Sequence, residues 1–556
     1  MASSEPTTIQ QALQVGLPKI LAAIPAEWRG TTFKNQVLLG RTEFCARLRE
    51  LLLSKGYAEI TGEDLVALGN AEDYLRVSSN VSSLLEFSLA VRHGVEEVSG
   101  VFSFASRVMP LMAMLLTTPA PATVHLLLNG ASCPISQDNL ALLPLLNCRL
   151  QLHSGSSLDS HDNSSNENGV IVGWSEDLLG HEAPLSFSKV HAVASPFLLL
   201  IRDTGKVDPS RVLVVRKRMS SPLTTPMCEA VLKSFAEGLP ADPSTAGPES
   251  EQLAGFYEHL QTMSGADPAP EHPPVCCTSG LATICSVWMA LILHQGGADV
   301  VMASTAYGGS SELTDLLAAR GANFRKHTFD ITGTNPITPA IQGAFDKLAE
   351  KGSEGLLPTT VLFVEIPTNP DMKVPELAEL AAVLEGYRAA TGKRVLLLLD
   401  TTFAPSSQAM AKLAPLMPNV TLLTFISLSK SVSRGLTTDG TVVAASTPAA
   451  YELLEHVRAA ATLLDTSAKP DQLLVLSQNH TGVEDRCQRA YEVAIAVGSA
   501  LREAVRQHCA GYDMPLAFVT PAQASLGFSS STFSFNLPAI AGASQSVNES
   551  LAQRFV

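Results

Sequence analysis

The strongest constraint on the fold is a regular alternation of helical segments and short apolar runs between residues 275 and 450. The helical segments are 281–295, 310–320, 338–351 and 375–391, and the apolar runs are 298–303, 323–327, 361–365, 395–399 and 420–426. The runs show no polar–apolar alternation, which is typical of strands that are buried on both faces. We therefore expect an α/β fold in which helices cover both faces of a mainly parallel sheet.

Charged residues follow two of these runs. Asp400 comes directly after the run 395–399, and Lys430 lies shortly after the last run. Ligands in such folds bind beyond the carboxyl ends of the strands, so both side chains are expected at one site. These are the two charged groups that pyridoxal 5'-phosphate (PLP) needs, because the amine forms a Schiff base and the carboxylate keeps the pyridine nitrogen protonated. The hydroxyls of Ser427 and Ser429 are candidates for binding the cofactor phosphate.

Five short motifs occur in one order between residues 275 and 445. They are Ser279-Gly280-Leu281-Ala282, Tyr307-Gly308-Gly309, Pro367-Thr368-Asn369-Pro370, Asp400-Thr401-Thr402-Phe403-Ala404 and Ser427-Leu428-Ser429-Lys430. With these motifs the chain resembles the Cys/Met metabolism (trans-sulfuration) family of PLP-dependent enzymes, which includes cystathionine γ-synthase, cystathionine lyases, methionine γ-lyase and homoserine sulfhydrylases. The resemblance is specific over this span and much weaker outside it. It implies PLP-dependent transferase fold type I, with a seven-stranded-type sheet and a small, truncated α+β C-terminal domain.

The resemblance also implies roles for individual residues. Lys430 is similar to the Schiff-base lysine, which later carries protons, and Asp400 is similar to the pyridinium partner, with Thr402 nearby. Tyr307 resembles the tyrosine that stacks on the cofactor ring, and Asn369 resembles the asparagine that bonds the ring hydroxyl. Each residue also has a structural alternative, such as a helix cap for Asp400 or a turn for Tyr307 and Asn369.

Two further segments are candidates for binding the cofactor phosphate. Ser279, Gly280 and Leu281 open a helix, whose free N–H groups and dipole suit an anion. Arg218 is similar to the arginine of a Tyr-Ser-Arg arm that, in the family, reaches the phosphate of a neighbouring subunit. Because Arg216 occupies the tyrosine position, the arm is altered, and an ordinary basic turn is an equal alternative. An arm of this kind predicts a homodimer or homotetramer.

We expect four regions along the chain. They are an N-terminal extension (1–200), an arm with a surface insertion (201–274), the PLP-binding domain (275–450) and an incomplete small domain (451–556). Residues 74–80 resemble residues 216–222, and a helix and a strand follow each segment. This pattern suggests an internal duplication whose first copy has lost its chemistry, with chance similarity as an equal alternative.

The C-terminal region is expected to lack one functional group of the family. There, the arginine that binds the substrate carboxylate lies beyond a strand similar to residues 531–537, and few residues follow that strand here. Either the chain is a truncated product or another element supplies this contact.

Composition narrows the classes of partner. The formal net charge of −15 argues against nucleic acid or an anionic membrane as a main partner. The nine cysteines show neither a paired ladder nor metal-ligand spacing, so free thiols in a reducing compartment are expected. The N-terminus lacks the pattern of a secretory signal, and apolar stretches fall short of the roughly 18–20 residues of a membrane span. These features predict a cytoplasmic protein.

The expected activity is γ-replacement on an activated homoserine by a thiol, as in cystathionine γ-synthase. The small-molecule substrate is then a sulfur amino acid or a homoserine ester. A γ- or β-elimination lyase is the first alternative, and a degenerate PLP-binding subunit without turnover is the second.

Overall fold

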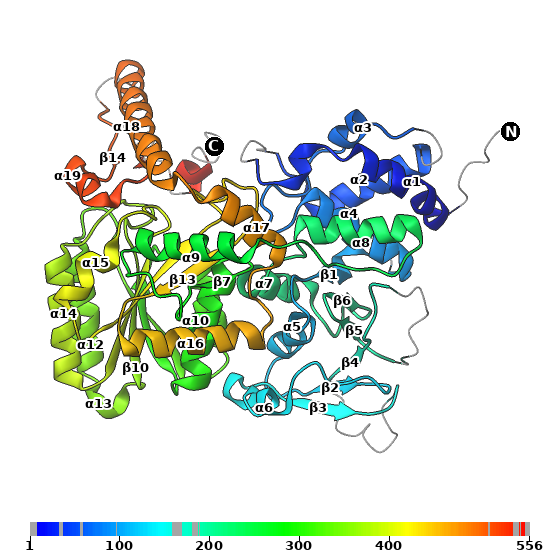
Figure 1. Cartoon of the computed structure of the whole chain (residues 1–556), viewed down its shortest axis with the longest axis horizontal. Helices are drawn as coiled ribbons and strands as arrows, with labels where there is room; N and C mark the ends of the chain where they lie inside the picture. Colours follow the sequence, from blue (N-terminus) through cyan, green and yellow to red (C-terminus); the bar gives the residue numbers. More distant parts are fainter. Residues whose placement is uncertain are drawn as a thin grey trace.

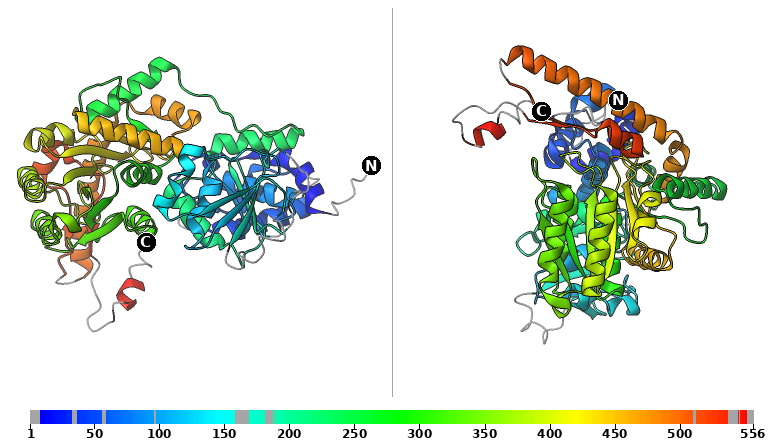
Figure 2. Two further views of the ribbon diagram at one scale, coloured as in Figure 1. Left: turned by 90° about the horizontal axis from the view of Figure 1, so that it is seen from below. Right: turned by 90° about the vertical axis from the view of Figure 1, so that its left-hand side faces the viewer.

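Two α/β lobes lie side by side in the computed structural model (Figures 1 and 2). The structure describes residues 8–32, 37–55, 59–95, 97–157, 169–180, 187, 189–509, 512–536, 544 and 546–550. The N-terminal lobe is built around a six-stranded sheet, and the C-terminal lobe is built around a seven-stranded sheet. One continuous hydrophobic core includes residues from both sheets, so the two lobes are packed together.

The sheet of the C-terminal lobe confirms the predicted α/β architecture. Its strands are β7 (Val275–Cys277), β8 (Ala298–Ala303), β9 (Phe324–Phe329), β10 (Thr359–Glu365), β11 (Arg394–Asp400), β12 (Thr421–Ser427) and β13 (Gly440–Ala444). The order across the sheet is β7-β13-β12-β11-β10-β8-β9, and the five strands from β12 to β9 are parallel. β13 runs antiparallel to both of its neighbours, β12 and β7. The sheet is therefore mainly parallel, as predicted.

Helices cover this sheet because its central strands are apolar on both sides. Every residue of β8 and β10 is buried, and successive residues of a strand point to opposite faces. The helices of this lobe are α9 (Ser250–Ser264), α10 (Gly280–His294), α11 (Gly308–Ala318), α12 (Ile337–Ala349), α13 (Gly352–Gly355), α14 (Leu377–Thr391), α15 (Ala409–Leu413), α16 (Pro448–Leu463) and α17 (Pro470–Asn479). α10 and α16 pack together against β12 and β13, whereas α12 and α14 pack together near β9 and β11.

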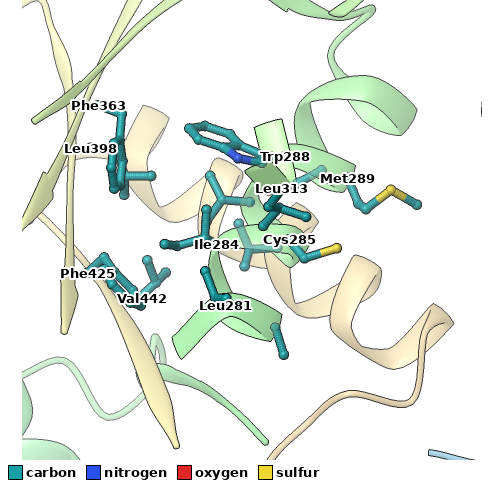
Figure 3. Packing of buried hydrophobic residues seen from close by; sticks show 14 of the residues in the cluster. Leu281, Ile284, Cys285, Trp288, Met289, Leu313, Phe363, Leu398, Phe425 and Val442 are labelled. Atoms are coloured by element: carbon teal, nitrogen blue, oxygen red, sulfur yellow. The ribbon is translucent and has the colours of Figure 1, made fainter. Parts of the chain in front are cut away.

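α10 packs against the sheet through a hydrophobic core. All residues of α10 from Gly280 to Leu293 are buried, which fits its strongly apolar sequence. Trp288 lies between helix and sheet, with its ring 6.1 Å from that of Phe363 and 5.8 Å from that of Phe324, measured between ring centroids (Figure 3). α10 is therefore held rigidly against the sheet, and its first turn is held at the sheet edge.

The sheet of the N-terminal lobe separates two hydrophobic layers. Its strands are β1 (Val101–Ser103), β2 (Val124–Leu127), β3 (Leu150–His153), β4 (Val170–Trp174), β5 (Ala192–Ser195) and β6 (Leu198–Ile201), in the order β1-β6-β5-β4-β2-β3. Leu199 and Ile201 belong to the core shared with the C-terminal lobe, whereas Leu198 and Leu200 face the N-terminal helices. The expected boundary at residue 200 lies within β6, so the N-terminal lobe extends beyond it.

Helices cover both faces of this sheet. Those of the N-terminal lobe are α1 (Ile9–Ala23), α2 (Gly40–Lys55), α3 (Gly62–Ala67), α4 (Asn80–Arg92), α5 (Met109–Thr117), α6 (Gln137–Leu140), α7 (Pro209–Met219) and α8 (Thr225–Glu237). α8 packs against α1 and α4. α7 instead packs between the lobes, because it contacts α5 on one side and α10 and α11 on the other.

Part of the expected surface insertion is core. α9 buries Phe256, Leu260 and Met263, because apolar residues recur along one face of this helix. The segment 201–274, expected to hold an arm and a surface insertion, therefore contributes α9 to the core, where this helix packs against α17 and α15.

The C-terminal elements begin with a long helix that projects from the lobe (Figure 1). This helix is α18 (Val483–His508). It is followed by β14 (Leu516–Ala517), α19 (Pro521–Gln523) and β15 (Ser534–Phe535), and β14 and β15 form a small antiparallel sheet. The end of the predicted strand, residue 537, lies outside the described residues.

Two general features bear on the expected environment. Within the described ranges, no helix is both long enough and apolar enough to span a membrane. All nine cysteines have free thiols, and seven of them are buried.

Candidate functional site

A cavity of about 240 Å³ lies at the carboxyl ends of β10, β11 and β12. Its lining residues come from both lobes: Tyr74, Arg76, Gly280, Leu281, Ile284, Tyr307, Ser310, Glu365, Pro367, Asn369, Asp400, Thr402, Phe403, Phe425, Ser427 and Lys430. Parallel strands end at one edge of a sheet, so residues that are distant in sequence meet there. The two charged groups singled out in the sequence, Lys430 and Asp400, thus line the same cavity.

The structure brings most of the predicted site residues together. Those at the cavity are Gly280, Leu281, Tyr307, Asn369, Asp400, Thr402, Ser427 and Lys430. Ser279, Ser429 and Arg218 are not among the lining residues. The Ser279 hydroxyl caps α10 by accepting a hydrogen bond from the Ala282 N–H, 3.2 Å away. The buried Ser429 hydroxyl donates to the Asp439 carbonyl and accepts from its N–H.

Arg218 lies elsewhere because an acidic side chain binds it. Its Nε donates to Oε2 of Glu312, on α11, at 2.6 Å. The arginine among the lining residues of the cavity is instead Arg76, from the N-terminal lobe. The predicted role of Arg218 in phosphate binding therefore has no support from its position.

The amine of Lys430 contacts a residue that was not predicted as part of the site. Its Nζ donates to the Tyr74 hydroxyl at 2.6 Å, and it also lies over the Tyr74 ring, 4.6 Å from the centroid. Arg76 lies on the same ring and donates to the Tyr307 hydroxyl at 3.2 Å. Burial opposes ionisation of Tyr74, but the charges of Lys430 and Arg76 outweigh it and lower the pKa of this phenol.

Two buried carboxyl groups face the cavity side by side. Glu365 and Asp400 are directly paired between β10 and β11. Burial raises the pKa of Asp400, although bonds from Thr402 and the charge of Lys430 favour the carboxylate. Burial and the charge of Asp400 raise the pKa of Glu365, although it accepts the N–H groups of Tyr307 and Asn369. Glu365 therefore tends to keep its proton when Asp400 is ionised.

The first turn of α10 is held unusually close to the sheet. A Cβ on Gly440 would lie 2.4 Å from the Gly280 Cα, and a Cβ on Gly280 would lie 3.1 Å from the Phe425 ring. Glycine at both positions lets the N-terminus of this 15-residue helix reach the cavity wall. N–H groups at such a terminus are a binding site for anions.

One hydroxyl at the cavity has no partner. Ser310, near the start of α11, is 1% exposed, and its Oγ bonds to no group in the described part of the chain. Buried polar atoms are normally hydrogen-bonded, so an unsatisfied one in a cavity wall points to a polar ligand.

Sequence reasoning missed Tyr74, Arg76 and Ser310 at the cavity. A signal for the first two was present, because Tyr74-Leu75-Arg76 has the tyrosine and arginine spacing that residues 216–218 lack. For Ser310 the sequence carries no signal beyond its place after Tyr307-Gly308-Gly309.

The arrangement suits a planar, anionic ligand that reacts with an amine. Lys430 supplies the amine, Asp400 supplies a buried carboxyl, and Tyr307 supplies an aromatic ring at the cavity. The α10 terminus, Arg76 and the free Ser310 hydroxyl supply donors for an anion. This donor set fits PLP.

Two solved structures are similar to part of this chain. A cystathionine γ-lyase from Micromonospora echinospora is 21% identical, with a TM-score of 0.37 over 51% of this chain and 64% of that one. A cystathionine γ-synthase from Xanthomonas oryzae pv. oryzae, solved with aminoacrylate and cysteine, is 19% identical, with a TM-score of 0.37 over 53% of this chain and 67% of that one.

Two curated relatives match over shorter stretches. The methionine γ-lyase of Arabidopsis thaliana is 34% identical over 138 residues, which cover 25% of this chain and 26% of the relative. The cystathionine β-lyase of Coxiella burnetii is 29% identical over 126 residues, which cover 23% of this chain and 27% of the relative. The match thus spans about a quarter of the length of each relative.

A family model matches the region that holds most of the cavity. The model of the Cys/Met metabolism PLP-dependent enzymes aligns with residues 258–417, which include Gly280, Tyr307, Glu365 and Asp400. Four of the five motifs singled out in the sequence lie within this match, and Ser427-Leu428-Ser429-Lys430 lies beyond it. Residues 258–417 are therefore similar to the Cys/Met metabolism PLP-dependent enzyme family, a match that covers less than half of the chain.

Proposed function

We propose that the chain binds PLP in the cavity through Lys430 and acts on a sulfur amino acid or an activated homoserine. The observation that carries the proposal is that Lys430 and Asp400 line one cavity together with the N-terminus of α10. When bound, PLP supplies an electron sink next to the substrate α-carbon.

Each group of the cavity then has a defined task. Asp400 is the anion for the pyridine nitrogen, and the Thr402 N–H, which donates to Asp400 Oδ1 at 2.9 Å, orients it. Tyr307 stacks on the ring, and Asn369 bonds to the ring hydroxyl. A separate group of donors, namely the N–H groups of the α10 terminus and the hydroxyls of Ser310 and Ser427, binds the phosphate.

Lys430 has a second task after the substrate has entered. Its Nζ takes the proton from the substrate Cα and returns it later, as a general base and acid. The Tyr74 hydroxyl, 2.6 Å from Nζ, holds the amine in one direction during this transfer. Holding a reacting group in place removes part of the entropic barrier.

The proposed reaction is γ-replacement, in which a thiol takes the place of the γ-substituent of an activated homoserine, as in cystathionine γ-synthase. Elimination is the second candidate, and the names of the two curated relatives, a γ-lyase and a β-lyase, favour it. A location in the cytoplasm belongs to the same proposal.

The test is a substrate panel on the purified full chain. The wild type should show the visible absorbance of lysine-bound PLP, and Lys430→Ala should lose it. Lys347→Ala, an exposed lysine on α12, is the matched control and should keep it. Cystathionine formed from an O-acyl-homoserine and cysteine supports replacement, whereas a keto acid released without a thiol supports elimination.

Two outcomes would contradict parts of this proposal. Wild-type protein that contains no PLP after incubation with it would overturn the cofactor assignment. PLP bound through Lys430 without turnover of any sulfur substrate would instead favour a degenerate PLP-binding subunit without catalysis.

A further inference from the structure

The two sheets of the chain share one topology. When β10 is left out of the C-terminal sheet, each sheet has six strands, which can be numbered 1 to 6 in the order in which they occur along the chain. Across both sheets these strands then lie in the same order, 1-6-5-4-2-3. The directions agree as well, since the first and sixth strands and the sixth and fifth are antiparallel in both sheets. All other neighbours in the two sheets are parallel. Chance similarity of one helix–strand unit does not account for agreement over a whole sheet.

Similar segments precede the two sheets and contact one another. Residues 74–80 and 216–222 share Arg, Ser and Ser at equivalent places. In the first segment, Nη1 of Arg76 donates to the Lys217 carbonyl at 2.7 Å. In the second, Nη2 of Arg216 donates to the Val77 carbonyl at 3.3 Å. The helices that follow, α4 and α8, also pack together, as expected for two copies related by a pseudo-twofold axis.

Each segment reaches the other copy. Residues 74–76 place Tyr74 and Arg76 in the cavity beyond β10, β11 and β12. Arg216, at the place that corresponds to Tyr74, instead reaches the N-terminal lobe, where its Nη1 lies 2.5 Å from Oε1 of the fully buried Glu86. Arg41 binds the other oxygen of Glu86. Arg216 is therefore held in a buried ion cluster of the N-terminal lobe and does not reach the cavity lining.

The first copy also lacks the element that carries the lysine. Between β12 and β13 the chain makes a loop, residues 428–439, that includes Lys430. Between the corresponding strands β5 and β6 there are only Pro196 and Phe197. The first copy has thus kept the fold and the reaching segment but has no reactive amine at this place.

We propose that residues 74–201 are a degenerate second copy that acts as a resident partner, so that Tyr74 and Arg76 complete the candidate site within a single chain. Arg76 supplies positive charge for an anionic group of the ligand, and Tyr74 holds the Lys430 amine. This replaces the expectation that a neighbouring subunit of a homodimer or homotetramer supplies the arm. The identity of the ligand rests on the proposed function, whereas the in-chain contact does not.

The first test measures PLP affinity against dilution of the full chain. Fluorescence titration should give one PLP per chain, with an affinity that is constant down to concentrations at which light scattering shows the mass of a single chain, 58.8 kDa. If only an associated form binds PLP, and affinity falls as it dissociates, a second chain completes the site and the proposal is wrong.

The second test compares the arginines of the two segments. Arg76→Gln should weaken PLP binding by about tenfold or more, because a charge-assisted contact is lost. It should affect pyridoxal, which lacks the phosphate, much less. Arg218→Gln is the matched control, since this arginine pairs with Glu312 outside the cavity lining, and it should change affinity by less than about threefold. Equal effects of the two variants would overturn the role of Arg76.

The third test separates this inference from the proposed function, because it needs no cofactor. In PLP-free protein, Lys430→Ala should raise the pKa of Tyr74, since Lys430 is one of the charges that lower it. Phenolate absorbance that is absent in Tyr74→Phe identifies the signal, and Tyr512→Phe is the control. If the wild type binds no PLP but this shift occurs in single chains, the proposed function fails and the in-chain contact stands. No shift would overturn the contact.

Discussion

Gly440→Ala tests the close contact between α10 and the sheet on which the candidate site depends. The added Cβ would lie 2.4 Å from the Gly280 Cα and 2.8 Å from its N, whereas ordinary contacts begin at 3.4 Å. The nearest atoms belong to the backbone, so the first turn of α10 or strand β13 must move by about 1 Å. Gly440 does not have a positive φ, so the effect is steric and not conformational.

The expected cost follows from overpacking of a buried contact, about 1–3 kcal/mol. Urea denaturation should therefore show a lower midpoint for Gly440→Ala. Hydrogen exchange should be faster in peptides that cover the start of α10, and PLP affinity should fall, because the helix terminus moves relative to Ser427 and Lys430.

Gly343→Ala is the matched control for this variant. Gly343 lies inside α12 with no atom within 4 Å of an added Cβ, so alanine should stabilise the protein by about 0.5–1 kcal/mol through helix propensity. If Gly440→Ala is as stable as the wild type, with unchanged exchange in α10, the backbone contact of helix and sheet does not exist and the reasoning is refuted.

Two further substitutions test the core and the electrostatics of the site. Trp288→Ala should lower the free energy of unfolding in urea by about 3–5 kcal/mol. Trp288→Phe should lower it much less, because the buried indole N–H has no hydrogen-bond partner among the described residues that the substitution would remove. Equal losses in the two variants would contradict this packing. Burial and the charge of Asp400 raise the pKa of Glu365. The contribution of this carboxyl group to the free energy of unfolding is therefore fully present below the usual pKa of 4.5 and is lost as the pH rises through the raised pKa. Glu365→Gln should therefore gain thermal stability over PLP-free wild type as pH increases across that interval, and a constant difference would disprove the raised pKa.

The sequence alone determined the second sheet and half of the site. Residues 361–364 and 395–399 are continuous apolar runs, which are typical of strands covered on both faces, and a carboxylate follows each run directly. Once these strands are parallel, Asp400 and the loop with Lys430 must come to the same edge. This information is local, because it depends on hydrophobic pattern and on the residue that follows each strand.

Only the tertiary structure shows which residues from elsewhere in the chain complete the cavity at that edge of the sheet. Tyr74 reaches Lys430 across 356 positions of the chain, and no local pattern encodes such a contact. It depends on how two complete lobes bury their apolar faces against each other through α7. The same packing explains the positions of the two arginines. Arg218 has the expected motif position but pairs with Glu312, whereas Arg76 lines the cavity. The hydrophobic pattern of a sequence indicates that one face of a helix or strand is buried. Which distant segment covers that face depends on how whole lobes pack together.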